Sequence, residues 1–276
     1  MELYELIAPC HFGLEAVMKR EILDLGYEIE RVEDGKVTFL ADAEGIAYAN
    51  LFLRTTERIL LKVGQVHAET YDELFEATKA LPWEKFIPKN GKFWVTKANS
   101  IKSKLFSPSD IQSIMKKAIV ERLKQVYHME WFPEDGAQYP IRVSILKDEV
   151  TIGLDTSGVS LHKRGYRKLT AKAPITETLA AALIMLTPWK GDRILVDPFC
   201  GSGTFPIEAA MMAADMAPGL NRHFLAESWE QVSDTEWKFK IHEGVKFHDG
   251  NELTTKDVKF FLDNIESNAS AASRFV

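Results

Sequence analysis

The residues around Asp197 have the types and spacing of a cofactor-binding turn. Residues 194–196 form a short apolar run that is partly β-branched, which predicts a strand buried in a parallel sheet. Asp197 ends this run with a carboxylate, and the glycines within residues 201–203 let a ligand approach the backbone closely. An Ala/Met-rich helix over residues 207–214 follows. Because ligands bind beyond the carboxyl ends of such strands, the sequence predicts a nucleotide-cofactor site here.

Other chemistries match this stretch less well. The triphosphate pattern Gly-x-x-x-x-Gly-Lys-Ser/Thr and the dinucleotide pattern Gly-x-Gly-x-x-Gly do not occur in it. Cys200 has no His or Asp at a spacing that suggests a general base, so a small loop residue is favoured over a nucleophile. An ordinary tight turn without a ligand is the remaining alternative.

Length and composition predict a globular chain of about two domains. The 276 residues are 46% hydrophobic and 27% charged, and the net charge of −6 does not indicate a nucleic-acid binder as a whole. The two cysteines cannot form a disulfide framework, which favours a reducing compartment. No secretory signal is recognisable, and the apolar run 179–186 is far shorter than the ~18 residues of a membrane span. We therefore expect a cytoplasmic protein.

The elements of residues 1–67 follow a ferredoxin-like order. Strand patterns at residues 3–8, 27–32, 36–40 and 59–66 alternate with two helical patterns, which gives β-α-β-β-α-β. Asp34-Gly35 predicts the hairpin, and Asp42 predicts the start of the second helix. A packing module without chemistry is the favoured interpretation of this unit.

Residues 68–155 form a second unit with a local excess of positive charge. Helices are predicted over residues 71–81 and from Ser107-Pro108 onward, with strands at residues 92–97, 141–146 and 150–154. From Lys89 to Lys124 nine Lys/Arg face only two acids, and Phe93, Trp94 and Phe106 are interleaved with them. Such a patch on an acidic chain indicates a polyanion partner. A solvated helix face is the alternative.

A second basic cluster connects this unit to the cofactor turn. Residues 156–176 contain five Lys/Arg and no acid; the five are Lys163, Arg164, Arg167, Lys168 and Lys172. Arginine can bind phosphate with two parallel hydrogen bonds, and His162 and Tyr166 could stack on a base. Pro174 then predicts the first turn of an amphipathic helix.

Three segments in this order resemble one family. They are Leu161-His-Lys-Arg-Gly-Tyr-Arg167, Ala173-Pro-Ile-Thr-Glu-Thr-Leu-Ala-Ala181 and Asp197-Pro-Phe-Cys-Gly-Ser-Gly-Thr204. Together they resemble the bacterial THUMP-domain RNA methyltransferases, class I S-adenosylmethionine (SAM)-dependent enzymes, and most of all the members that methylate guanine N2 in 23S rRNA. The resemblance runs from residue 1 to about residue 229 and implies a structured, ribosomal RNA partner.

The resemblance also implies which residues bind the cofactor and the RNA. The cofactor set is Pro174, Thr176, Glu177, Thr178, Asp197, Pro198, Phe199, Cys200, Gly201, Ser202, Gly203 and Thr204. The RNA set, which the basic clusters supply, is Lys97, Lys102, Lys104, His162, Lys163, Arg164 and Arg167. No metal site is expected, because His242 and His248 have no third ligand at a suitable spacing.

The expected architecture combines α/β and α+β parts. It comprises a ferredoxin-like unit (1–67), a THUMP domain (68–155), the incomplete first part of a Rossmann-like methyltransferase domain (156–236) and a tail (237–276). The tail resembles a fragment of periplasmic peptide- and solute-binding proteins, with strands on both sides of Gly244 and a helix after Thr254 or Thr255. We therefore expect a chimera.

The family chemistry is methyl transfer to an exocyclic amine of a base that has left its stack. In the family an Asn-Pro-Pro-Tyr segment holds that amine, and neither this segment nor Asp-Pro-Pro-Tyr occurs in these residues. We therefore assign no catalytic residue and expect a catalytically incomplete chain. A non-catalytic RNA-binding protein and a DNA amino-methyltransferase are the alternatives.

Overall fold

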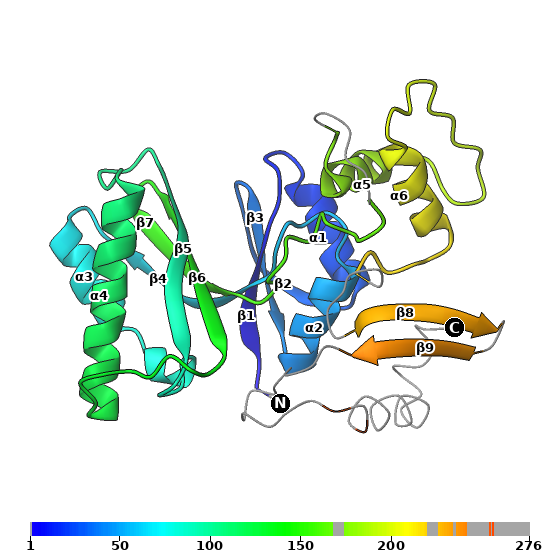
Figure 1. Cartoon of the computed structure of the whole chain (residues 1–276). Coiled ribbons are helices and arrows are strands. Elements are labelled where there is room, and N and C mark those ends of the chain that lie inside the picture. Colours follow the sequence, from blue (N-terminus) through cyan, green and yellow to red (C-terminus); the bar gives the residue numbers. More distant parts are fainter. Residues whose placement is uncertain are drawn as a thin grey trace. The chain divides into compact units, whose positions relative to one another are not determined.

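The computed structural model describes residues 2–167, 174–219, 226–233, 236–241, 254 and 256. The chain divides into two compact units, Met1–Arg222 and His223–Val276. The first unit contains a seven-stranded sheet with the order β2-β3-β1-β4-β7-β6-β5, together with the helices that pack against it (Figure 1). The second contains a two-stranded sheet.

The first half of the large sheet has the ferredoxin-like order that the sequence predicts. The elements are β1 (Tyr4–Pro9), α1 (Glu15–Asp24), β2 (Glu28–Glu33), β3 (Lys36–Ala41), α2 (Ala43–Phe52) and β4 (Leu60–His67). Asp42 starts α2 because its carboxylate accepts a hydrogen bond from the Gly45 amide at 2.8 Å. Leu6, Met18 and Phe39 lie in the core between the helices and these strands.

The second half contains the elements predicted for residues 68–155. They are α3 (Tyr71–Ala80), the short 3₁₀ helix η1 (Trp83–Lys85), β5 (Lys92–Ile101), α4 (Pro108–Tyr127), β6 (Gln138–Leu146) and β7 (Glu149–Asp155). Strand β4 joins the two halves: it pairs with β1 only at Leu60 and Leu61, but with β7 along its whole length. The two predicted units therefore share one sheet.

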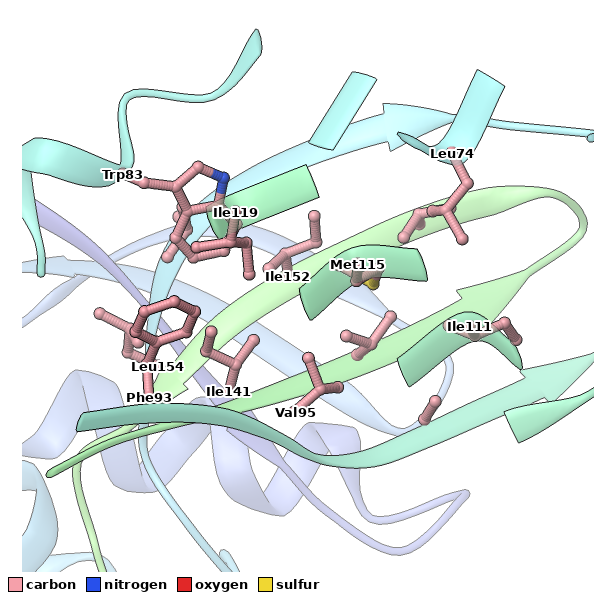
Figure 2. Close-up of a cluster of buried hydrophobic side chains, with 14 of the residues drawn as sticks. Leu74, Trp83, Phe93, Val95, Ile111, Met115, Ile119, Ile141, Ile152 and Leu154 are labelled. Carbon is pink, nitrogen blue, oxygen red and sulfur yellow. The ribbon is translucent and has the colours of Figure 1, made fainter. Parts of the chain in front are cut away.

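Helices α3 and α4 cover this half of the sheet and enclose its core. Figure 2 shows Met115 and Ile119 of α4 directed toward Ile141 and Ile152 of the strands, with Trp83 at one end of the cluster. The Trp83 indole donates to the Thr78 carbonyl at 2.7 Å, so its buried polar group is satisfied.

The strand predicted at residues 194–196 is absent from the structure. Ile194 is 91% exposed and Val196 is 79% exposed, and no ladder pairs this segment with any strand of the described residues. An apolar run becomes a strand only where neighbouring strands accept its backbone hydrogen bonds, so the local prediction was wrong here. The flanking helices are present as α5 (Glu177–Leu186) and α6 (Thr204–Ala213), and they pack against each other.

The second unit contains β8 (Ala226–Ser233) and β9 (Glu236–Ile241), which pair antiparallel. The sequence predicts a strand from Trp237 that pairs with the residues beyond Gly244. In the structure the strand from Trp237 is part of β9, which pairs with β8, the strand that precedes it. Residues 242–253, which include His242 and His248, lie outside the described residues, so the predicted pairing beyond Gly244 stays a prediction. Of the predicted helix after Thr255 only Lys256 is described, and it is helical.

Candidate cofactor and RNA-binding sites

The turn before α6 has a backbone that requires glycine. Gly201 and Gly203 have φ values of +52° and +75°, in the left-handed region that side chains disfavour. The Gly203 amide donates to the Cys200 carbonyl at 2.7 Å and closes the turn, and Gly203 is also the N-cap of α6. A Cβ at position 203 would meet no atom closer than 3.6 Å. The glycines are therefore needed for the backbone conformation, and the space beside them is open.

A hollow of about 450 Å³ lies beside the start of this turn. It is lined by residues of α5, of the segment after it and of α6: Leu183, Ile184, Thr187, Trp189, Ile194, Leu195, Val196, Asp197, Pro198 and Phe205. The volume is within the range of small-molecule sites. Phe199, one residue beyond the lining, is 92% exposed.

Two polar atoms of the predicted cofactor segments are buried without a partner among the described residues. They are Oδ2 of Asp197 and Oγ1 of Thr176. The other Asp197 oxygen accepts from the Phe199 amide at 3.1 Å. Buried polar atoms are nearly always satisfied, so these atoms fit a ligand that donates hydrogen bonds. SAM carries an ammonium group and ribose hydroxyls, and the residues present fit it.

Arg167 contacts both cofactor segments. Its Nη2 donates to Thr204 Oγ1 at 2.6 Å, and its Nε lies 3.3 Å from Glu177 Oε1. Glu177 is the first residue of α5 and Thr204 is the first residue of α6. In this structure the Arg167 guanidinium, which the sequence predicts to bind RNA, therefore binds two residues of the predicted cofactor set.

Arg164 is only 1% exposed, which does not fit the prediction that it contacts RNA phosphates. Its Nε lies 3.5 Å from Glu208 Oε1 of α6, and its Nη1 donates to the Leu161 carbonyl at 2.8 Å. The Tyr166 hydroxyl donates to the same Glu208 oxygen at 3.0 Å. Burial raises the pKa of Glu208, and the nearby Arg164 charge opposes that rise.

A third contact network centres on Glu57, which precedes β4. Its carboxylate interacts with His162 Nδ1 at 2.7 Å and accepts hydrogen bonds from Ser160 at 2.7 Å and from Thr178 of α5 at 2.6 Å. Burial alone would raise the pKa of Glu57, but these hydrogen bonds outweigh it and lower the pKa to about 2. Sequence reasoning missed Glu57 and Glu208, because their partners are distant in the chain and no motif marks either residue.

The three lysines predicted to bind RNA within residues 68–155 are exposed. Lys97 lies on β5, which is an edge strand of the sheet, and Lys102 and Lys104 follow in the next loop. Lys104 forms an ion pair with Glu69, whereas Lys97 and Lys102 have no ion pair among the described residues. Phe106 beside them is 80% exposed, while Phe93 belongs to the core.

The basic residues of α4 and of residues 156–176, here called the connector, differ in whether they are exposed and whether they form ion pairs. Arg122 and Lys124 are neutralised by Glu84 and Glu130. In the connector, Lys163 is exposed. Lys168 and Lys172 lie outside the described residues. No group of three or more His, Cys, Asp or Glu that could hold a metal occurs among the described residues, and no described helix is long and apolar enough to cross a membrane.

Three family models match the chain in succession. Residues 5–60 match the RlmL ferredoxin-like domain, residues 68–155 match the THUMP domain, and residues 164–270 match the RMKL-like methyltransferase domain. The last match includes most of the segment expected to be foreign, so the comparisons give no support to a solute-binding fragment or a chimera.

Two curated relatives have this organisation over the aligned part. The chain is 53% identical over 239 residues to "Putative RNA methyltransferase YpsC" of Bacillus subtilis, covering 86% of this chain and 62% of that protein. It is 30% identical over 280 residues to "Ribosomal RNA large subunit methyltransferase K/L" of a Marinomonas species, covering 99% of this chain and 38% of that protein. The chain thus spans less than two thirds of either relative.

Solved structures agree with these matches. A "possible methylase" from Clostridium difficile 630 superposes with a TM-score of 0.77 at 56% identity, over 81% of this chain and 59% of that one. SMU.472, "a putative methyltransferase complexed with SAH", gives a TM-score of 0.74 at 45% identity, over 80% of this chain and 59% of that one. The chain therefore contains an RlmL ferredoxin-like domain, a THUMP domain and residues of an RMKL-like methyltransferase domain.

Proposed function

We propose that this chain serves SAM-dependent N-methylation of a base in structured RNA, with ribosomal RNA as the substrate. One observation carries the proposal: Asp197, whose Oδ2 has no hydrogen-bond partner among the described residues, lines a hollow of about 450 Å³ just before the glycine turn, in a chain that also contains a THUMP domain. The names of the Bacillus and Marinomonas relatives support RNA, and the second supports ribosomal RNA.

The cofactor supplies an activated methyl group, and the residues of this chain hold and orient it. We assign Asp197 Oδ2 as a hydrogen-bond acceptor for the ligand, because it has no partner among the described residues, and Gly201 and Gly203 keep the space beside the turn open. Oriented binding of cofactor and base can by itself supply much of the rate of such a transfer. The acceptor base must leave its stack to reach the methyl group.

The RNA is held by positively charged side chains of the THUMP domain and of the connector. Lys97, Lys102 and Lys163 are exposed, and cations of this kind bind phosphates without reading the sequence. The exposed Phe106 ring offers an unpaired base a surface to stack on. These contacts would place the RNA, whereas the choice of nucleotide depends on a base pocket.

Calorimetry with SAM on the full chain tests the cofactor assignment. Gly203→Val places a β-branched side chain at φ +75° beside the open space and should abolish SAM binding. Gly158→Val is the matched control, because Gly158 has a similar φ of +62° and also has open space around it, but lies outside the cofactor segments. Equal SAM affinity in Gly203→Val and wild type would refute the assigned site.

A further inference from the structure

The basic cluster of the connector divides into residues that face outward and residues that face inward. Lys163 is exposed, whereas the Arg164 side chain is fully buried and that of Arg167 is 16% exposed. A run of like charges is usually solvated, so two arginines turned inward call for a structural reason. Arg164 is turned inward because it pairs with Glu208. Arg167 is turned inward because it binds Glu177 and Thr204, which belong to the assigned cofactor site.

Arg167 connects two segments that are distant in sequence. Glu177 opens α5, directly after Thr176 with its unsatisfied hydroxyl. Thr204 opens α6, directly after Gly203, and its Oγ1 lies 3.1 Å from the Ser202 hydroxyl. Both partners are nearly buried, at 4% and 2% exposure. One guanidinium therefore holds the starts of both cofactor segments at once.

We propose that Arg167 is a positioning residue, which locks the first turn of α5 and the glycine turn before α6 in the geometry that accepts the cofactor. The inference rests on the proposed function for the identity of that ligand. Hydrogen bonds between charged groups are stronger than neutral ones, and the rigid fork of arginine fixes two partners at defined angles. A lysine offers a single charged nitrogen and cannot reproduce both contacts with the same geometry. In this role Arg167 stays bound to Glu177 and Thr204 when RNA binds.

Hydrogen exchange on the full chain without cofactor tests the bridge directly. Arg167→Met should accelerate exchange of the amides of residues 175–180 and 199–208. Lys163→Met removes one positive charge from the same connector by the same change, and should leave these amides as in wild type. The exchange rates in Arg167→Lys should lie between those of Arg167→Met and those of wild type. Unchanged exchange in Arg167→Met would overturn the proposal.

A second variant addresses the case in which Arg167→Met fails to fold. Thr204→Val keeps the shape of the side chain and removes only the hydroxyl that accepts from Arg167, so it should also accelerate exchange of residues 199–208. Where both variants fold, the double variant should accelerate exchange of residues 199–208 by less than the two single effects combined, because both remove the Arg167–Thr204 contact. Additive effects, or no effect of Thr204→Val, would contradict the bridge.

Binding measurements separate this role from RNA contact. Arg167→Met should weaken SAM binding about tenfold or more and leave RNA affinity unchanged, while Lys163→Met should do the reverse. Loss of RNA affinity with intact SAM affinity in Arg167→Met would show that Arg167 is an RNA contact. If wild type binds no SAM, the cofactor part of the proposed function fails, and the exchange data still decide whether Arg167 orders the two segments.

Discussion

At the scale of single residues, the contacts of the connector show charges used to join parts of the fold. Arg164 and Glu208 pair with both side chains fully buried, which removes two charges from water. Breaking such a pair is costly, because the remaining charge is left buried and uncompensated. Glu57 acts similarly: one carboxylate binds His162 of the connector and Thr178 of α5. These carboxylates attach the connector to α5 and α6.

Glu57 should make the free energy of unfolding depend on pH in the acidic range. Its folded-state pKa of about 2 lies below the unfolded value of about 4.3, so the charged form favours folding. That contribution is complete above the unfolded pKa and is lost as the pH falls from about 4 toward about 2. Urea midpoints should decline less steeply in Glu57→Gln than in wild type over this range. Glu44→Gln, at an exposed position on α2, should decline like wild type; equal slopes for all three proteins would contradict the role of Glu57.

At the scale of elements, prediction succeeded where a sequence pattern could be satisfied locally or within one unit. The start of α2 follows from Asp42, and the hairpin between β2 and β3 follows from Asp34-Gly35, where Gly35 has a φ of +75°. The strand at residues 194–196 failed, because its formation depends on neighbouring strands and not on its own composition. The pairing of β4 with both β1 and β7 was also not predicted, because the pattern of a single strand does not show which strands lie beside it.

Helix α4 should supply much of the stability of the second half of the sheet. Ile119 on its inner face is completely buried, so Ile119→Ala should lower the free energy of unfolding by about 2–5 kcal/mol. Val126 lies on the same helix at 37% exposure, and Val126→Ala should change stability by less than about 1 kcal/mol. Urea denaturation measures both. Similar losses in the two variants would show that α4 is not packed as Figure 2 shows.

At the scale of the whole molecule, charge has to be considered locally. The net charge of −6 repels a polyanion, yet exposed lysines are concentrated on the THUMP domain and at the start of the connector. Screening limits each charge to about 10 Å at 0.1 M salt, so a local patch can bind what the whole chain repels. The sequence showed where basic residues accumulate but not which of them form ion pairs within the protein. The carboxylates that bind Lys104, Arg122 and Arg167 come from other segments of the chain.

RNA binding should therefore depend on a subset of the basic residues and on salt. Lys102 and Lys163 are exposed, and neither has a carboxylate partner among the described residues. Lys102→Glu and Lys163→Glu should each weaken binding of structured ribosomal RNA in a filter assay, and each lost phosphate contact should reduce the slope of log affinity against log salt by about 1. Lys19→Glu, an exposed reversal on α1 with the same change in net charge, is the control and should retain the wild-type slope. Equal weakening in all three variants would mean that total charge, and not a defined patch, governs the interaction.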